Sequence, residues 1–336
     1  MQDRKLTMLC KKPFIKDGLP FGCGQCLPCR VKKRREWTNR IILESLGHEN
    51  NAFVTLTYNN ENLPLKDGKG TLVPQHLKEW QKSITYHSGM PLRFFGVGEY
   101  GEETKRPHYH AIIFGYPGCA NMDVKCSCTS CETLRSSWKV GHVLNGVLTK
   151  DSAAYVAGYT TKKMTDRYPE EKYEKLLKKN PELAESYKKN VLDYLEGRHP
   201  EFARMSNGGG KSKIKGGIGY PALKAIRHSL ETEYGCDLVA ELQDVPDLIT
   251  MGGKSLLIGK YLKNKLRDMM GVPDEWKEKK LLQLQAERIK EYTEYAEEIT
   301  QRTKILSQEK FLIEKNIQLV RNLEKRMSLK QTKGEL

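Results

Sequence analysis

Two histidines one residue apart, His108 and His110, are the residues whose type and spacing point most directly to chemistry. They flank Tyr109 and lead into an apolar run at residues 111–114, which predicts a β-strand. Side chains two residues apart leave the same face of a strand, so both imidazoles can hold one cation while Tyr109 points away. A surface or packed histidine pair is the alternative. The pair therefore marks a candidate metal site that needs further ligands.

An acidic residue, Glu99, lies nine positions before His108. Residues 93–101 have the pattern of a strand that runs into a glycine-bounded turn, and a hairpin would bring Glu99 beside the histidines. One carboxylate and two imidazoles leave open positions on Mg²⁺ or Mn²⁺ for water and phosphate oxygens. The alternative is a solvated charged turn, to which we assign Glu102 and Glu103. We predict that Glu99, His108 and His110 are the metal ligands.

Two tyrosines occupy a segment of helical character at residues 153–163. Tyr155 and Tyr159 are four residues apart and Lys162 follows three residues later, so all three share one helical face. Tyrosines at this spacing are more commonly an aromatic core pair. Beside a metal site, however, the face would present two phenols and a cation. We therefore predict that Tyr155, Tyr159 and Lys162 are catalytic.

These segments together resemble the HUH endonucleases, and especially the rolling-circle replication initiators of gokushovirus-like microviruses, which are small single-stranded DNA phages. Three motifs occur in the family's order: a strand at residues 53–58, the histidine strand at His108 and His110, and the tyrosine helix. The turn at residues 98–101 also resembles the family, whose third metal ligand is commonly acidic. This match covers about residues 50–165, and weaker resemblance extends to residues 23–30, 204–206 and 216–220. Roughly the last sixty residues match nothing.

The resemblance implies an α+β fold, in which an antiparallel sheet of about five strands carries the histidine pair centrally and is flanked by helices. It also implies a replication initiator that binds single-stranded and origin DNA and nicks one strand. The nick leaves a 5′-phosphotyrosine and a free 3′-hydroxyl, and the protein later rejoins the ends. Tyr159 is the closer match to the nucleophile of single-tyrosine relatives, and Lys162 would hold phosphate. A relaxase or transposase, or a metal-stabilised DNA-binding regulator without cleavage, is the alternative.

The composition favours a polyanionic partner. The 336 residues include 57 Lys and Arg against 42 Asp and Glu, a formal net charge of +15. No apolar segment approaches the roughly 20 residues of a membrane-spanning helix, and residues 1–15 lack the apolar region of a signal peptide. We therefore expect nucleic acid, not a membrane, as the partner, in the cytoplasm of the bacterial host cell.

Eight of the nine cysteines form two groups, as expected for thiols or metal ligands in a reducing compartment. Four thiolates are the count of a closed structural zinc site. The first group has the tight spacing Cys-x-x-Cys-x-x-Cys, for which iron–sulfur ligation is an alternative. The second is less regular and is the weaker zinc candidate, and unliganded thiols are the alternative for both. The groups are Cys10, Cys23, Cys26 and Cys29, and Cys119, Cys126, Cys128 and Cys131.

A basic segment follows the first cysteine group. Residues 1–50 carry eleven Lys or Arg against five Asp or Glu, and Trp37 and Ile41 have helical spacing. We predict a helix with a buried stripe and a basic face that contacts the phosphate backbone, with a merely solvated face as the alternative. The predicted DNA-binding residues are Arg30, Lys32, Lys33, Arg34 and Arg35.

We divide the chain into a cysteine-rich basic arm (1–49), a nicking core (50–165), an accessory basic region of helices and loops (166–270) and a C-terminal long helix or coiled coil (271–336). Residues 274–333 lack Gly and Pro, and ten of fourteen heptad positions counted from Leu282 are apolar. Dimerisation through this helix is one hypothesis, and a helical hairpin fits equally well. Because neither Gly-Lys-Ser tripeptide has the earlier glycine of a P-loop, we expect a host helicase and polymerase to be recruited.

Overall fold

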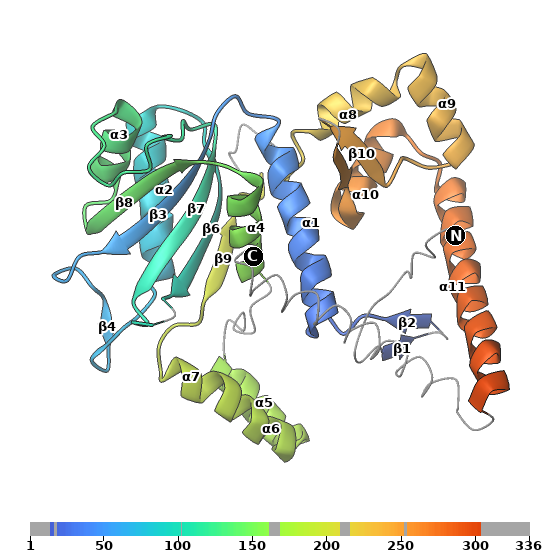
Figure 1. Ribbon diagram of the computed structural model, residues 1–336, viewed down its shortest axis with the longest axis horizontal. Coiled ribbons are helices and arrows are strands. Elements are labelled where there is room, and N and C mark those ends of the chain that lie inside the picture. Colours follow the sequence, from blue (N-terminus) through green and yellow to red (C-terminus); the bar gives the residue numbers. More distant parts are fainter. Residues whose placement is uncertain are drawn as a thin grey trace. The chain divides into compact units, whose positions relative to one another are not determined.

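The computed structural model describes residues 14–16, 19–101, 103–160, 169–208, 216–251 and 254–303. Residue contacts divide the chain into two compact units. The sheet unit comprises Arg34–Ile226 and Leu256–Leu262, and the helical unit comprises Met1–Lys33, Arg227–Ser255 and Lys263–Leu336. Figure 1 labels the elements of both.

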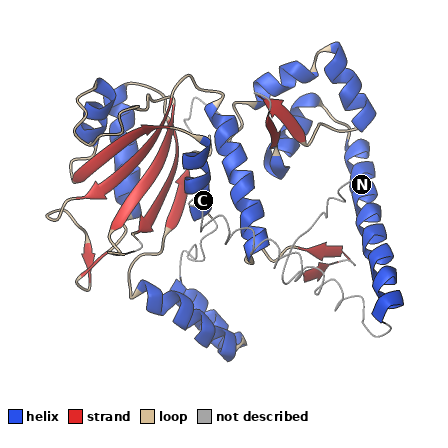
Figure 2. Cartoon of the chain, in the orientation of Figure 1, coloured by secondary structure: helices blue, strands red, loops and turns tan. Residues whose placement is uncertain are grey.

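The sheet unit is built on five antiparallel strands in the order β8-β3-β7-β6-β9 (Figure 2). The predicted α+β class, with about five antiparallel strands flanked by helices, is therefore confirmed. The strand with the two histidines is the middle one, which is where the resemblance placed it. The strands are β3 (Asn51–Tyr58), β6 (Arg93–Tyr100), β7 (Pro107–Phe114), β8 (Gly141–Val147) and β9 (Phe202–Met205).

Alternation along β3 explains why helices cover both faces of this sheet. Val54 and Leu56 are buried in one core cluster, together with residues of α2 (Pro74–Ser88) and α3 (Thr129–Ser137). Phe53 points the other way and packs on a second cluster, with residues of α1 (Leu27–Ser45) and α4 (Lys150–Tyr159). Successive side chains of a strand leave opposite faces, so each strand contributes to two cores. The helix predicted after the first cysteine group is α1, with Ile41 fully buried.

The remaining elements are short hairpins and helices. Pro169 and Pro181 start α5 and α6, where a proline's missing N–H costs no helical hydrogen bond. The hairpins are β1 (Phe14–Lys16) with β2 (Leu19–Phe21), β4 (Leu65–Lys66) with β5 (Lys69–Gly70), and β10 (Leu248–Met251) with β11 (Lys254–Leu257). The helices are α5 (Pro169–Lys179), α6 (Pro181–Tyr187), the π-helical η1 (Lys188–Leu192), α7 (Asp193–Leu195), α8 (Leu223–Leu230), α9 (Glu233–Leu242) and α10 (Gly259–Met270).

The long helix α11 (Asp274–Thr303) begins where the loss of Gly and Pro predicts it. Leu281, Leu282, Leu284 and Ile289 on this helix are exposed. The later heptad positions lie outside the described residues, so dimerisation through them stays a prediction. Of the helices in the described ranges, none combines the length and the apolar composition needed to cross a bilayer.

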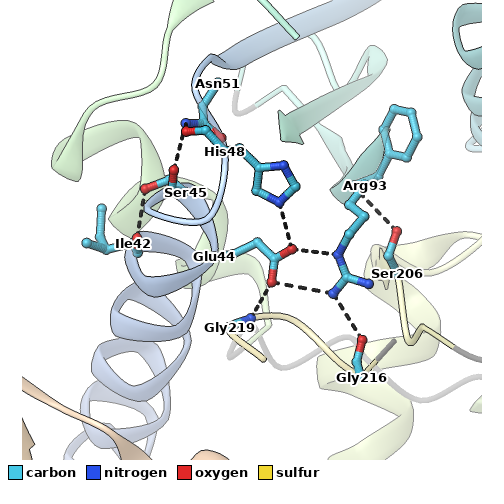
Figure 3. A network of polar contacts seen from close by, with 10 residues as sticks. Ile42, Glu44, Ser45, His48, Asn51, Arg93, Ser206, Gly216 and Gly219 are labelled. Carbon is cyan, nitrogen blue, oxygen red and sulfur yellow. Dashed lines mark hydrogen bonds and ion pairs between the residues drawn. The ribbon is translucent and has the colours of Figure 1, made fainter. Parts of the chain in front are cut away.

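A buried ion pair joins the end of α1 to the start of β6 (Figure 3). The Glu44 carboxylate accepts hydrogen bonds from the Arg93 guanidinium and, at 2.6 Å, from the Gly219 backbone N–H. Arg93 also donates to the Gly216 carbonyl at 3.0 Å. Burial raises the pKa of Glu44, but the hydrogen bonds from His48 and Arg93 prevail and hold it below its usual value. One of the weakly resembling segments, residues 216–220, thus supplies partners to this pair.

The turn at Gly216 requires glycine. Its φ is +80°, and an added Cβ would collide with the Tyr220 ring. The turn therefore brings the Gly216 carbonyl close enough to accept from Arg93.

We predict that Arg93→Met destabilises the protein by about 3–5 kcal/mol, because it leaves the Glu44 carboxylate buried beside one cation fewer. Urea unfolding followed by tryptophan fluorescence measures this loss. The matched control is Arg227→Met, which removes the exposed ion pair with Glu231 and should cost no more than about 1 kcal/mol. Equal losses for the two variants would show that the buried pair is not what holds α1 to β6.

Candidate active site

The hairpin of β6 and β7 brings Glu99 beside both histidines, as predicted. Glu99 is paired with His108 in the strand register. Its Oε1 atom accepts from Nε2 of His108 at 2.6 Å and from Nε2 of His110 at 2.8 Å. Glu99 and His110 are buried, while the His108 side chain is 18% exposed. The three residues form one cluster at the edge of the buried region of the sheet.

The outer nitrogen of each imidazole is held by the protein. Nδ1 of His108 donates to the Arg106 carbonyl at 3.1 Å, and Nδ1 of His110 lies 2.9 Å from the Thr55 hydroxyl. The Phe53 ring also stacks on His110, with 5.6 Å between the centroids and 6° between the planes. Such contacts fix the orientation of an imidazole, and they are typical of metal-ligating histidines. Both Nε2 atoms consequently face Glu99.

The Glu99 carboxyl is held in its charged form. Its burial alone would raise the pKa, but hydrogen bonds and the charges of His108 and His110 lower it to about 2. A carboxylate that stays ionised is the form that binds a cation.

The tyrosine helix α4 begins at a capping box. The Thr149 hydroxyl accepts from the Ser152 backbone N–H at 3.1 Å, and the Ser152 hydroxyl accepts from the Thr149 N–H at 2.8 Å. Ala153, Val156 and Ala157 are buried against the sheet. The residues between them, at helical spacing, leave the two tyrosines beside the histidine cluster.

The two phenols form a hydrogen-bonded chain that ends on Glu99. The Tyr155 hydroxyl donates to Glu99 Oε1 at 2.9 Å and lies 3.4 Å from Nε2 of His110. The Tyr159 hydroxyl donates to the Tyr155 hydroxyl at 2.8 Å. Tyr155 is 42% exposed, so the buried core pair considered as the alternative does not describe it. Of the two phenols, Tyr155 is the nearer to the candidate metal ligands.

The predicted basic face of α1 has two kinds of residue. Lys32, Lys33 and Arg35 are exposed, whereas Arg30 and Arg34 are half-buried. Arg34 donates from Nε to the Ala154 carbonyl of α4 at 2.9 Å. Its side chain therefore helps to fix the tyrosine helix, whatever it does toward DNA.

Two predicted site residues, Lys162 and Cys10, lie outside the described residues. Cys23, Cys26 and Cys29 have their Sγ atoms within 4.8 Å of one another, and Cys23 Sγ accepts from the Cys26 backbone N–H at 3.3 Å. The four thiols of the second group also meet within 4.8 Å.

Sequence reasoning missed Thr55, Phe53 and Arg34 as parts of this site. Thr55 and Phe53 lie within the strand recognised as the first motif, and the period of two places them on one face. The missing information is the register that pairs Thr55 with His110. Arg34 gave no signal, since its contact with Ala154 spans 120 residues of chain.

The matches to known proteins fall on this site. Residues 51–164 match a family of replication-associated proteins, described by its member ORF2. Replication-associated protein VP4 of Bdellovibrio phage phiMH2K is 35% identical over 153 residues, which are 43% of this chain and 49% of that protein. Replication-associated protein ORF4 of Chlamydia phage 1 is 31% identical over 160 residues, covering 43% and 38% of the two chains. The resemblance to microvirus replication proteins is therefore confirmed.

A third relative, replication-associated protein ORF2 of Spiroplasma virus 4, is 32% identical over 165 residues, which are 46% of this chain and 51% of that protein. The chain thus spans about half the length or less of the curated relatives it matches. No solved structure matches this chain.

The pKa of Glu99 leads to a pH prediction. A carboxyl whose pKa is lowered on folding stabilises the protein above its unfolded pKa and loses that contribution as the pH falls toward its folded value. Removing metal with a chelator and comparing the wild type with Glu99→Gln by urea unfolding should show the largest difference near pH 6. The difference should shrink as the pH falls through about 4.5 toward about 2. Glu103→Gln, at an exposed position, is the control. A difference independent of pH would contradict this account of Glu99.

Proposed function

We propose, from the match of residues 51–164 to a replication-associated family, that this chain initiates replication by nicking and rejoining one strand of origin DNA. Tyrosine is the proposed nucleophile, and Glu99, His108 and His110 are the proposed ligands of Mg²⁺ or Mn²⁺. One observation carries the proposal: the Tyr155 hydroxyl donates to the same Glu99 oxygen on which both histidine Nε2 atoms converge.

The donor set suits a hard or borderline divalent ion. Two imidazole nitrogens and one carboxylate oxygen lie within 4.8 Å of one another. Three protein ligands leave coordination positions for water and substrate, unlike a closed structural site. Nδ1 of His108 already donates to a carbonyl, which leaves Nε2 as its ligand atom. When bound there, the ion would withdraw charge from a non-bridging oxygen of the scissile phosphate.

The proposed reaction is an exchange of phosphodiesters. The Tyr155 oxygen attacks phosphorus, so that the Tyr155 Oη–P bond forms and the bond from phosphorus to the 3′-oxygen breaks. The phenol loses its proton, and the departing 3′-oxygen gains one. The products are a 5′-phosphotyrosine and a free 3′-hydroxyl, which can prime synthesis. Because one phosphodiester replaces another, the step needs no ATP and can run backwards to join ends.

Tyr159 has two proposed roles. Its hydroxyl donates to the Tyr155 oxygen at 2.8 Å, so it would stabilise the negative charge that develops on Tyr155. It would then act as the second nucleophile, cutting the regenerated origin while Tyr155 still carries DNA. The resemblance pointed to Tyr159 as the counterpart of the nucleophile in single-tyrosine relatives. The hydrogen bond from Tyr155 to Glu99 favours Tyr155 for the first cut.

The DNA partner rests on charge. Exposed Lys32, Lys33 and Arg35 on α1 are the described part of the proposed phosphate-binding face, and the chain carries a formal charge of +15. Lys162, outside the described residues, is proposed to hold phosphate beside the tyrosines. A host helicase and polymerase would supply unwinding and synthesis.

We predict that Tyr155→Phe/Tyr159→Phe abolishes covalent adducts with single-stranded origin DNA in the presence of Mn²⁺ while leaving DNA binding intact. Mass spectrometry of the DNA-linked peptide identifies the nucleophile, which should be Tyr155 in the first turnover. Tyr159→Phe alone should slow the first cut about 10–100-fold, the cost of one hydrogen bond to a charged oxygen. Adducts that persist in the double variant would reject both nucleophiles, and a wild type that binds without forming adducts would favour a regulator.

A second prediction concerns the support of His110. Thr55→Val removes the hydroxyl beside Nδ1 of His110 and should weaken Mn²⁺ binding about 10–100-fold, as losses of such orienting contacts do. Titration calorimetry of the full chain measures it. Thr57→Val, two residues along the same face of β3, is the matched control. Equal Mn²⁺ affinities for the two variants would contradict the assignment of His110 as a ligand.

A further inference from the structure

A second cluster of metal-binding side chains lies away from the tyrosines. The Sγ atoms of Cys119, Cys126, Cys128 and Cys131 all lie within 4.8 Å of one another. Cys119 and Cys126 come from the loop between β7 and α3, Cys128 is the N-cap residue of α3, and Cys131 lies in its first turn. Residues twelve positions apart have thus been folded around one point.

The spacing of these sulfurs fits a shared ion better than a disulfide. Sγ of Cys119 is 3.6 Å from Sγ of Cys126. A disulfide requires about 2.05 Å between sulfurs. Four sulfurs placed tetrahedrally at about 2.3 Å from zinc are about 3.8 Å apart. Among the described cysteines none forms a disulfide, and this group alone supplies four thiols to one point.

The surroundings would stabilise thiolates. The Asn145 side-chain amide donates toward Cys131 Sγ at 3.7 Å, and the Asn121 amide donates toward Cys126 Sγ at 3.8 Å. Cys128 and Cys131 also occupy the start of α3, where the helix dipole favours negative charge, and the Cys128 side chain makes no capping bond there. Negative sulfur is the form that binds zinc.

We propose that Cys119, Cys126, Cys128 and Cys131 bind one Zn²⁺ ion in a closed structural site. The proposal is independent of the nicking function and reverses the order of the two groups expected from spacing alone.

The site would attach an irregular loop to the sheet. Residues 115–128 contain no helix or strand. Asn145 of the edge strand β8 is buried and also donates to the Pro117 carbonyl at 3.3 Å. At Gly118 the loop runs so close to the backbone of Gly146 and Val147 that an added Cβ would approach it to 2.5 Å. Zinc would therefore hold the loop, the start of α3 and β8 together.

The cluster and the candidate active site belong to opposite faces of the sheet. Asn145 shares a strand face with Val143, which is buried in the cluster with α2 and α3. The tyrosine helix contributes to the other cluster. Loss of the ion should therefore lower stability without removing the metal ligands of the nicking site.

The test is the zinc content of the full chain purified from cells grown with zinc, measured by elemental analysis. Cys128→Ser/Cys131→Ser should contain one zinc equivalent per chain fewer than the wild type and should melt at a lower temperature. The control Cys236→Ser, at an exposed cysteine outside both groups, should match the wild type. Comparing variants by difference excludes any zinc held by the first cysteine group.

Several outcomes would overturn the proposal. Equal zinc in all three proteins would do so, as would iron in place of zinc, or an intact mass reduced by two hydrogens for each disulfide. If the double variant does not fold, Cys128→Ser alone decides, because Cys128 is exposed. This variant should surrender zinc to a competing chelator about 10-fold or more readily than Cys236→Ser. Identical release from the two single variants would overturn the proposal as well.

Discussion

The register of the β6–β7 hairpin is the constraint on which the site depends. It pairs Glu99 with His108, and antiparallel alternation then puts His110 on the same face. Because side chains alternate with a period of two, a slip of one residue would turn Glu99 away from both imidazoles. The register is fixed by burial, since every residue of β6 is buried and the apolar part of β7 fills two cores at once. The proposed metal ligands therefore owe their convergence to the packing of residues that bind nothing.

The same sheet connects the site to distant parts of the chain. Arg93 opens the strand that carries Glu99, and its buried pair with Glu44 ties β6 to α1. Arg34 of α1 in turn holds the backbone of α4 at Ala154. The helix with the tyrosines and the strand with the carboxylate are thus both fastened to α1. This arrangement explains why a tyrosine hydroxyl can lie within hydrogen-bonding distance of a carboxylate 56 residues earlier.

Local patterns allowed the histidine strand, the hairpin and the shared face of Tyr155 and Tyr159 to be predicted. Each depends on residues close in sequence and on the fixed periods of strands and helices. The positions of Thr55 and Phe53 beside His110 could not be predicted, because strand order and register are set by packing over the whole sheet. The second cysteine group shows the same limit. Its irregular spacing made it the weaker candidate, but a loop without regular structure can bring such thiols together.

The most direct test of the central claim is an anomalous diffraction map of crystals of the full chain soaked in Mn²⁺. The account predicts a manganese peak bonded to Nε2 of His108, Nε2 of His110 and the Glu99 carboxylate, with the Tyr155 hydroxyl beside the open positions of the ion. A peak at other residues, or a Tyr155 side chain turned away from an ion bound at these three, would contradict it.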